Sequence, residues 1–214
     1  MAPRIAAAIR IPALREADTK AANNTPTLMA EPHVCPWWVG WLLASPLRKL
    51  AGDPAGLLAP FVRPGMSVLE PGPGMGFFTI DLARLVGPEG RVVAVDVQPK
   101  MIEGLRRRAE RAGLSDRIEA RVVPAATMAL DGYDGAFDFV LAFAMVHETP
   151  SAETFFAEVV RAMKPGATLL LAEPAGHVRD EEFNRELALA AKSGLAAVGG
   201  PLVWRSRTAI LRKS

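Results

Sequence analysis

The alternation of apolar and polar segments along the chain predicts an α/β fold. From Leu57 onward, short apolar runs of strand length alternate with longer segments in which apolar residues recur every three or four positions. This alternation is typical of a doubly wound parallel sheet with helices on both faces. The apolar runs predict five strands, at residues 67–70, 91–96, 118–123, 137–143 and 168–172. Because residues 137–143 are apolar almost throughout, we expect that strand near the centre of the sheet.

Helical periodicity fills the intervals between these runs. We expect one helix to begin near Phe77 and end at Gly87-Pro88, and a second to run from Pro99 to Gly113. A third begins after Ser151 as N-cap and stops at a turn over 164–166, and a fourth covers 180–192. The expected buried faces of the first three helices are Phe78, Leu82 and Leu85; Ile102, Leu105 and Ala109; and Phe156, Val159 and Met163. Two strands at 195–198 and 204–211 close the chain.

Composition narrows the class of protein. The chain has 214 residues, of which 50% are hydrophobic and 22% charged, as in an ordinary globular protein. Its formal net charge of +2 is too small to indicate a nucleic-acid partner. A single cysteine excludes a disulfide framework within the chain and fits a reducing compartment, so we expect a cytoplasmic protein. The basic run at 106–108 lies among glutamates and reads as a solvated helix face.

The first quarter of the chain lacks the strand and helix pattern. Residues 1–24 carry three arginines before the first acid, faintly like a transit peptide, but a disordered or frayed tail is the expected reading. We expect residues 25–54 to form a lid over the substrate and residues 55–214 to form the main domain. The most apolar stretch, 34–47, is too short to span a membrane and contains two prolines. Weak contact with a membrane surface stays open as an alternative.

One glycine-rich turn carries most of the functional information. The first predicted strand ends in Glu70 and continues as Pro-Gly-Pro-Gly-Met-Gly at 71–76, and the second predicted strand ends in Asp96, twenty residues past Gly76. The glycines let the chain turn sharply and bring its backbone close to a ligand. Asp96 is placed to accept hydrogen bonds from both hydroxyls of a ribose. Together these features predict a nucleoside-binding site.

The spacing also separates one cofactor class from another. A dinucleotide-binding turn reads G-x-G-x-x-G, but here Phe77 stands where its third glycine would be. A carboxylate at Glu70 would repel a pyrophosphate and suits a ligand that carries an ammonium group. At this point the sequence resembles the class I S-adenosylmethionine (SAM) methyltransferases of small-molecule type, in the methyltransferase type 11 or UbiE-like group. These enzymes share the acidic residue before G-x-G-x-G and the acid that ends the second strand.

The resemblance covers roughly residues 55–212 and implies a fold and a cofactor. It implies a seven-stranded, mostly parallel Rossmann-like sheet with the last strand antiparallel between the fifth and the sixth, and an N-terminal helical lid. SAM would be the methyl donor and S-adenosylhomocysteine (SAH) the product. By resemblance, Glu70 and the glycine backbone hold the methionine part, Asp96 holds the ribose and Val97 packs on the adenine. The expected cofactor-binding residues are Glu70, Gly72, Pro73, Gly74, Gly76, Asp96, Val97, Ala125 and Phe143. One departure is Pro124, which stands where many relatives place an aspartate for the adenine amino group.

The three histidines and the cysteine are candidates for the acceptor side. His147 follows the fourth predicted strand, beside the expected methyl group, and is the first candidate for a general base. His33 and Cys35 lie in the predicted lid, and His177 follows the fifth strand. Each has a structural alternative: His147 as a helix cap, His177 as a loop residue and Cys35 as a small buried hydrophobe. A metal site from His33, Cys35, His147 and Glu173 is conceivable because these ligand types suit zinc, but their scattered spacing does not predict one.

The expected function is methyl transfer to a small molecule. The Asp-Pro-Pro-Tyr type motif of nucleic-acid amino methyltransferases is absent after the fourth strand, where the sequence reads Ala-Met-Val-His at 144–147. A thiol, a metalloid or an apolar ring compound would each fit as acceptor, with Cys35 slightly favouring the first two. One alternative is a protein that binds SAM or a nucleotide without turnover. Another is a membrane-surface enzyme that acts on a lipid or a quinone. The sequence leaves the oligomeric state open.

Overall fold

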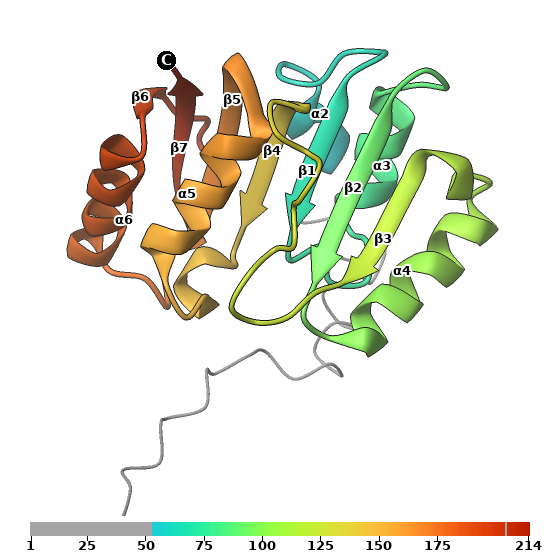
Figure 1. The fold of residues 1–214 in the computed structure, drawn as a ribbon, viewed down its shortest axis with the longest axis horizontal. Coiled ribbons are helices and arrows are strands. Elements are labelled where there is room, and N and C mark those ends of the chain that lie inside the picture. Colours follow the sequence, from blue (N-terminus) through green and yellow to red (C-terminus); the bar gives the residue numbers. More distant parts are fainter. Residues whose placement is uncertain (1–52, 204) are drawn as a thin grey trace, which may run out of the picture. The chain divides into compact units, whose positions relative to one another are not determined.

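The computed structural model describes residues 53–203 and 205–214, which form a seven-stranded sheet flanked by helices (Figure 1). The strand order is β3-β2-β1-β4-β5-β7-β6. The expected tail at 1–24 and nearly all of the expected lid at 25–54, with His33 and Cys35, lie outside the described residues. Within the described part of the chain, no helix is long and apolar enough to cross a membrane.

The elements follow one another largely as the apolar pattern predicts. The strands are β1 (Ser67–Pro71), β2 (Arg91–Asp96), β3 (Ile118–Val122), β4 (Phe137–Phe143), β5 (Met163–Pro174), β6 (Leu195–Gly199) and β7 (Ser206–Lys213). The α-helices are α2 (Pro54–Leu58), α3 (Thr79–Leu85), α4 (Pro99–Arg111), α5 (Ala152–Ala162) and α6 (Asp180–Lys192). Two short 3₁₀ helices are η2 (Ser115–Arg117) and η3 (Val146–Glu148). Ser151 caps α5 as expected, because its side chain accepts a hydrogen bond from the Thr154 N–H.

The sheet is mixed in the way that the resemblance implies. β1 to β5 run parallel to one another, with pairs such as Leu69 opposite Val93 and Leu69 opposite Val140. β7 lies between β5 and β6 and is antiparallel to both, which confirms the expected insertion. The carboxyl ends of β1 to β4 therefore meet along one edge of the sheet, the lower edge in Figure 1. In open sheets of this kind, ligands bind outside that edge.

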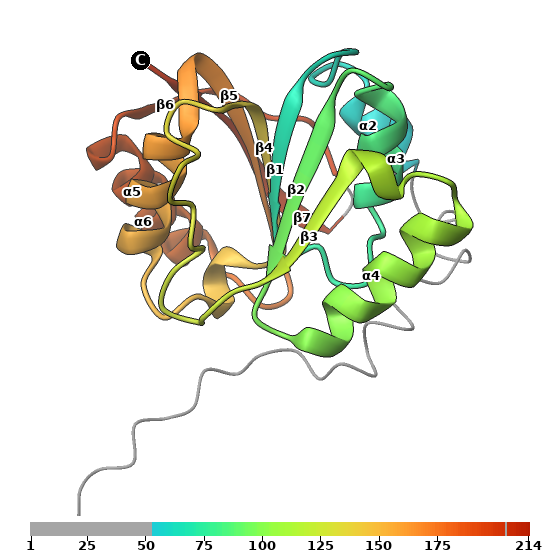
Figure 2. The same ribbon diagram turned by 45° about the vertical axis from the view of Figure 1, so that its right-hand side comes forward.

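The two faces of the sheet are covered by different helices. α5 and α6 cover one face, and α2, α3 and α4 cover the other (Figure 2). Successive residues of β1 point to opposite faces, so Leu69 packs in the cluster that contains Phe156 of α5, while Val68 packs in the cluster that contains Leu82 of α3. All four side chains are fully buried. This packing fixes the strand ends from both sides.

The prediction of a turn over 164–166 is wrong, because these residues lie within β5. Phe137 pairs with Met163, but the next pair is Phe139 with Thr168, so β5 carries three more residues than β4 between these two pairs. Gly166, with φ of 76°, accommodates this irregularity. Elsewhere the differences are shifts of element ends by a few residues, as where β7 begins at Ser206 instead of residue 204.

The glycine-rich turn and α4 interlock through two glycines. A Cβ atom at Gly76 would lie 2.5 Å from Leu105 Cδ1, and Gly76 also has φ of 85°. A Cβ atom at Gly104, inside α4, would lie 2.9 Å from Met75 Cγ. Glycine inside a helix costs about 1 kcal/mol relative to alanine. Both glycines leave room for a side chain of the other element, so the turn packs closely on the helix.

Candidate active site

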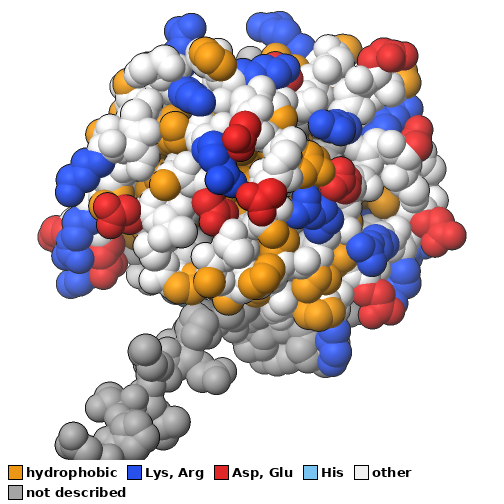
Figure 3. Space-filling view, in the orientation of Figure 1, with side chains coloured by type: hydrophobic (Ala, Val, Ile, Leu, Met, Phe, Trp, Pro, Cys, Tyr) orange, Lys and Arg blue, Asp and Glu red, His pale blue; other side chains and the backbone are white. Residues whose placement is uncertain are grey.

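A cavity of about 610 Å³ opens at the carboxyl ends of the parallel strands. Its lining comes from the turn after β1, the end of β2, the loop after β3, the segment after β4 and the end of β5. Hydrophobic side chains gather along this edge of the described part of the chain, the lower edge in Figure 3. Eight of the nine expected cofactor-binding residues line the cavity, together with His147 and His177. Gly76, the ninth, is absent from the lining and packs on Leu105 instead.

The turn after β1 brings backbone to the wall of the cavity. Gly72 and Gly74 have φ of 65° and 54°, a region that L residues seldom adopt. The Gly72 N–H donates a hydrogen bond to Val95 O at 2.9 Å, which ties the turn to β2. A Cβ atom at Gly72 would lie 2.9 Å from Met145 Cβ, whereas one at Gly74 would meet no atom within 4 Å. Gly72 is therefore required for packing, and Gly74 leaves open space beside the chain.

Glu70 is a buried carboxyl group without a full set of partners. Its exposed fraction is 3%, and Oε2 makes no hydrogen bond to any described residue. Burial raises the pKa of Glu70 to about 8; the nearby Thr79 hydroxyl partly opposes this change, and the charge of Asp96 adds to it. A cationic group in the cavity would favour the ionised form. Glu70 is thus suited to a positively charged ligand.

Asp96 ends β2 and borders the same cavity. Its Oδ1 accepts a hydrogen bond from the Gln98 N–H at 2.8 Å, which holds the side chain across the start of α4. Burial raises the pKa of Asp96 to about 6, although backbone N–H groups of Gln98 and Gly74 oppose the change. The group is therefore mainly ionised at neutral pH and can accept further hydrogen bonds from a ligand.

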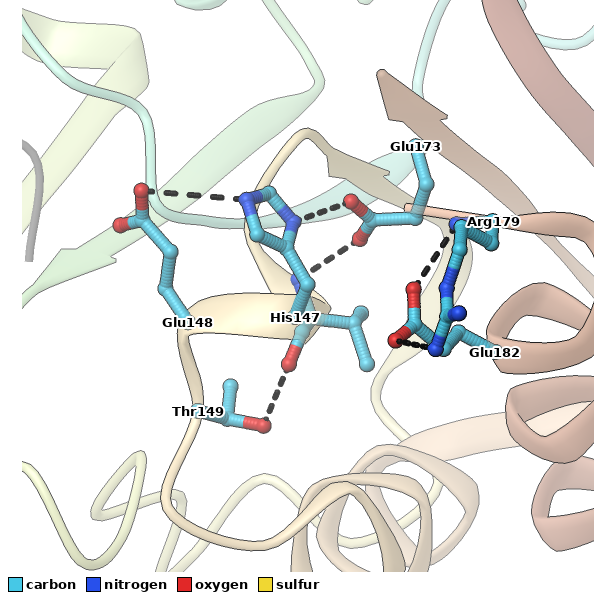
Figure 4. Close-up of polar contacts among 7 residues, drawn as sticks. His147, Glu148, Thr149, Glu173, Arg179 and Glu182 are labelled. Atoms are coloured by element: carbon cyan, nitrogen blue, oxygen red, sulfur yellow. Dashed lines mark hydrogen bonds and ion pairs between the residues drawn. The ribbon is translucent and has the colours of Figure 1, made fainter. Parts of the chain in front are cut away.

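His147 lines the same cavity and lies in η3, after β4. Its imidazole lies between the carboxyl groups of Glu173 and Glu148 (Figure 4). Nδ1 is hydrogen-bonded to Glu173 Oε2, while Nε2 is 3.9 Å from Glu148 Oε1, too far for a hydrogen bond. The hydrogen bond with Glu173 raises the pKa of His147, and partial burial opposes it. The His147 side chain is 21% exposed.

Glu173 anchors this arrangement from the end of β5. Its side chain is fully buried, and Oε1 accepts a hydrogen bond from the Val146 N–H at 2.8 Å. Both carboxyl oxygens therefore have partners in η3. Behind it lies Glu186 of α6, which is 7% exposed and whose Oε2 makes no hydrogen bond to a described residue. Burial, with the charge of Glu173, raises the pKa of Glu186 to about 7.

His177 lies at the rim of the cavity. Its ring centroid is 6.2 Å from that of His147, and it is exposed. The loop after β3 contributes Pro124 and Ala125 to the lining, and the carboxyl group of Glu158 in α5 holds this loop by accepting a hydrogen bond from the Met128 N–H at 2.7 Å.

A family model described as a methyltransferase domain matches residues 63–207. The chain belongs to the class I SAM methyltransferases. The matched residues include the turn after β1, the end of β2 and the segment with His147. The family and the fold imply SAM as the methyl donor.

Curated relatives are similar over parts of their length. A catechol O-methyltransferase of Mycobacterium tuberculosis is 48% identical over 73 residues, which are 34% of this chain and 33% of that protein. A ubiquinone/menaquinone biosynthesis C-methyltransferase UbiE of Hahella chejuensis is 37% identical over 113 residues, 52% of this chain and 44% of that protein. An arsenite methyltransferase of Aquipseudomonas alcaligenes is 27% identical over 163 residues, 74% of this chain and 46% of that protein. The chain thus spans less than half of each of these relatives.

Among solved structures, that of a SAM-dependent methyltransferase from Aquifex aeolicus matches with a TM-score of 0.74. The match is 25% identical in sequence and covers 84% of this chain and 98% of that one. It supports the same seven-stranded architecture.

The residues of the cavity fit SAM on structural grounds. SAM carries an ammonium group and a sulfonium, and the cavity offers the buried, incompletely bonded carboxyl group of Glu70. Its wall is otherwise largely apolar, and the ring of Phe78 contacts the rings of both Phe77 and Phe143. The backbone at Gly74 borders open space. Charge, shape and polarity therefore agree with this cofactor.

Sequence reasoning gave no role to Glu158 or Glu186, and it named Glu173 only as a conceivable metal ligand and not as a partner of His147. Glu173 ends a parallel strand, which is the position from which ligand-binding side chains arise, so the signal was present. Glu186 falls on the buried face of α6 with Phe183 and Ala190, where a charged residue is unusual. Glu158 gives no such signal, because its partner is a backbone N–H thirty residues away.

Proposed function

We propose that the protein transfers a methyl group from SAM to a small-molecule acceptor. The observation that carries this proposal is that one cavity joins two buried carboxyl groups, Glu70 and Asp96, to a histidine held by a third carboxyl group. The first two suit the cofactor, and the histidine suits an acceptor that must be positioned and deprotonated. Family membership supports the same reaction class.

In the proposed complex, each end of the cofactor has its own residues. Glu70 pairs with the ammonium group, and the backbone of Gly72, Pro73 and Gly74 follows the methionine part. The ribose hydroxyls donate to Asp96. Val97 and Ala125 contact the adenine, and Phe143 offers an aromatic wall near the sulfonium. Gly76 acts indirectly, because it lets the turn pack on Leu105.

When bound, SAM supplies a methyl group that is already activated by the sulfonium. The chain must therefore bind and orient the two reactants, exclude water and hold a proton where one is released. Correct alignment alone can lower the activation free energy by about 7–11 kcal/mol. His147 is the residue proposed to contact the acceptor, and its Nε2 the atom proposed to take the proton. His33 and Cys35 remain predicted acceptor-side residues of the segment at 25–54.

The acceptor is proposed to be a small molecule. The names of the relatives refer to a catechol, a quinone precursor pathway and arsenite, three chemically distinct acceptors. They support a small acceptor and do not select one for this chain. A cytoplasmic location is proposed from the single cysteine of the sequence.

Calorimetry with SAM, SAH and NAD tests the cofactor assignment. Binding of SAM and SAH with no heat from NAD is expected, because Phe77 stands where a dinucleotide-binding turn has its third glycine. Incubation of the protein and methyl-labelled SAM with a small-molecule extract should then yield a labelled product. Binding without a labelled product would favour a protein that binds SAM without turnover, and absence of SAM binding would refute the proposal.

A further inference from the structure

We propose that Glu173 and His147 form a proton-accepting dyad, and that the acceptor is an uncharged hydroxylated aromatic compound. This inference rests on the proposed function and deepens it. Glu173 is a positioning residue that fixes the orientation of the imidazole. His147 is the group that touches the acceptor.

Glu173 settles which ring nitrogen carries the proton. A carboxylate only accepts hydrogen bonds, and its Oε1 is already used by the Val146 N–H. Oε2 lies at hydrogen-bonding distance from Nδ1, so Nδ1 of His147 is the donor. In the neutral imidazole, Nε2 then bears the lone pair. The same residue thus fixes both the ring orientation and the tautomer.

The lone pair of Nε2 is available to a ligand. The nearest described carboxyl oxygen, Glu148 Oε1, is 3.9 Å away and makes no hydrogen bond to it. Figure 4 shows the ring between Glu148 and Glu173, with Nδ1 on the Glu173 side. His147 also lines the cavity that contains Gly72 and Phe143. A hydroxyl group in that cavity can donate its proton to Nε2.

The charge of the wall restricts the acceptor further. The described residues that line the cavity include Glu70, Asp96, Glu148 and Glu158, but no lysine or arginine. A carboxylate or phosphate on the acceptor would therefore lack a cation from this part of the chain. Phe77, Phe143 and other aromatic and apolar side chains form much of the remaining wall. An uncharged aromatic ring matches both features.

The reaction on such an acceptor balances. The hydroxyl oxygen forms a bond to the methyl carbon while the carbon–sulfur bond breaks and the sulfur keeps the electron pair. The hydroxyl proton passes to Nε2 of His147, and the products are a methyl ether, SAH and an imidazolium. The raised pKa of His147 helps it to hold that proton. Glu173 stabilises the resulting charge, and release of the proton to solvent restores the base.

Thiols and arsenic(III) compounds need this dyad less. A thiol with a pKa near ~8.5 is partly ionised in water at neutral pH, whereas a phenol has a pKa near ~10. Arsenic(III) attacks through a lone pair that carries no proton. A buried carboxyl group that orients a histidine therefore favours a hydroxyl acceptor over the soft acceptors that Cys35 slightly favours.

The test compares catechol, 3,4-dihydroxybenzoate, dithiothreitol and arsenite as acceptors, after SAM binding has been established by calorimetry. Methylation of catechol at a higher kcat/KM than 3,4-dihydroxybenzoate, which differs only by a carboxylate, is expected. Methylation of dithiothreitol or arsenite without catechol would overturn the inference. SAM binding with no methylated hydroxyl compound would overturn it as well. Failure of SAM to bind refutes the proposed function itself.

Variants separate positioning from structure. E173Q should lower kcat for catechol at least about tenfold while the affinity for SAM stays unchanged. It should also move the acidic limb of the pH–rate profile to lower pH, because the largest cause of the raised His147 pKa is lost. E181Q, at an exposed position of α6, is the matched control and should leave both unchanged. An E173Q enzyme with wild-type kcat and pH profile would contradict the dyad.

A spectroscopic readout needs no acceptor and covers the case in which E173Q does not fold. The ¹⁵N resonances of His147 in the wild-type protein, assigned by comparison with H147Q, should show a protonated Nδ1 and an unprotonated Nε2 above the pKa. The opposite tautomer would overturn the inference.

Discussion

Near the end of β1 one oxygen of the buried Glu70 carboxyl group has no hydrogen-bond partner among the described residues, whereas at the end of β5 both oxygens of the buried Glu173 are hydrogen-bonded. In the first arrangement, one carboxyl oxygen can still form a hydrogen bond or an ion pair with a ligand. In the second arrangement, Glu173 is bonded to other protein groups and fixes the orientation of the His147 side chain. In the proposed complex, the ligand completes the cofactor end, whereas the protein organises the acceptor end before the acceptor binds.

The largest effect on activity is expected at the acceptor end, from the loss of His147. H147A should lower kcat by about 10²–10⁴-fold, because it removes the proposed base, and should leave SAM affinity nearly unchanged. Steady-state kinetics together with calorimetry measures both quantities.

H177A is the informative companion of H147A. His177 lies at the rim, and its side chain has no recorded hydrogen bond among the described residues. Its loss of kcat should be smaller than that of H147A. Equal losses would mean that the two histidines act together, and an unchanged kcat in H147A would make that residue structural.

At the cofactor end, D96A should weaken SAM binding at least about 10-fold, because each hydrogen bond to a charged group contributes about 1.5–3 kcal/mol. The circular dichroism spectrum should stay that of the wild type. D116A, on the exposed η2, is the control and should bind SAM normally. Unchanged affinity in D96A would remove the ribose assignment.

The proposed role of Glu70 can be tested by counting the protons that are released when SAM binds. With a pKa of about 8, Glu70 is largely protonated at pH 7 without ligand, and a cationic ligand favours its ionised form. SAM binding at pH 7 should therefore release close to one proton, which calorimetry in two buffers of different ionisation enthalpy detects. The E70Q variant should release fewer protons and should bind SAM more weakly. Equal proton release in both proteins would show that Glu70 does not pair with the ammonium group.

The same pKa shift predicts a stability trend. A carboxyl group whose pKa rises from 4.5 to about 8 on folding binds more protons in the folded state. Its contribution to stability is full below about pH 4.5 and is lost as the pH rises towards 8. Thermal unfolding of the ligand-free protein should therefore show a steeper loss of stability over this range in the wild type than in E70Q.

The smallest effect is expected from E186Q. The charge of Glu186 raises the pKa of His147, so its removal should move the acidic limb of the pH–rate profile to lower pH, by less than about one unit. The maximal kcat should change little. A shift to higher pH would contradict the placement of Glu186 behind the dyad.

The fold was largely predictable from sequence because strands and helices here differ in period. The buried runs at 91–96 and 137–143 became β2 and β4 without change. The turn at 164–166 was mispredicted because Lys-Pro-Gly usually ends an element, whereas here β5 absorbs the three residues as an irregularity opposite β4. That outcome depends on pairing between strands, which a local pattern does not contain.

The cavity was predictable for a different reason. Parallel strands bring their carboxyl ends to one edge, so residues such as Asp96 and His147 had to border a common space. The hydrogen bond between His147 and Glu173 was not predictable, since it depends on the side-chain orientations of two residues that are 26 positions apart. The roles of Cys35 and His33 lie outside the described residues and remain predictions.

Gly104 lets α4 pack closely on the turn that borders the cavity, although Gly104 itself does not line that cavity. Because Met75 occupies the space that an alanine side chain would need, a methyl group added to the helix would push on the loop that borders the nucleoside cavity. Helix formation alone would favour alanine there. Evolution of this helix is therefore expected to be constrained by the ligand-binding loop, although its outer surface faces solvent.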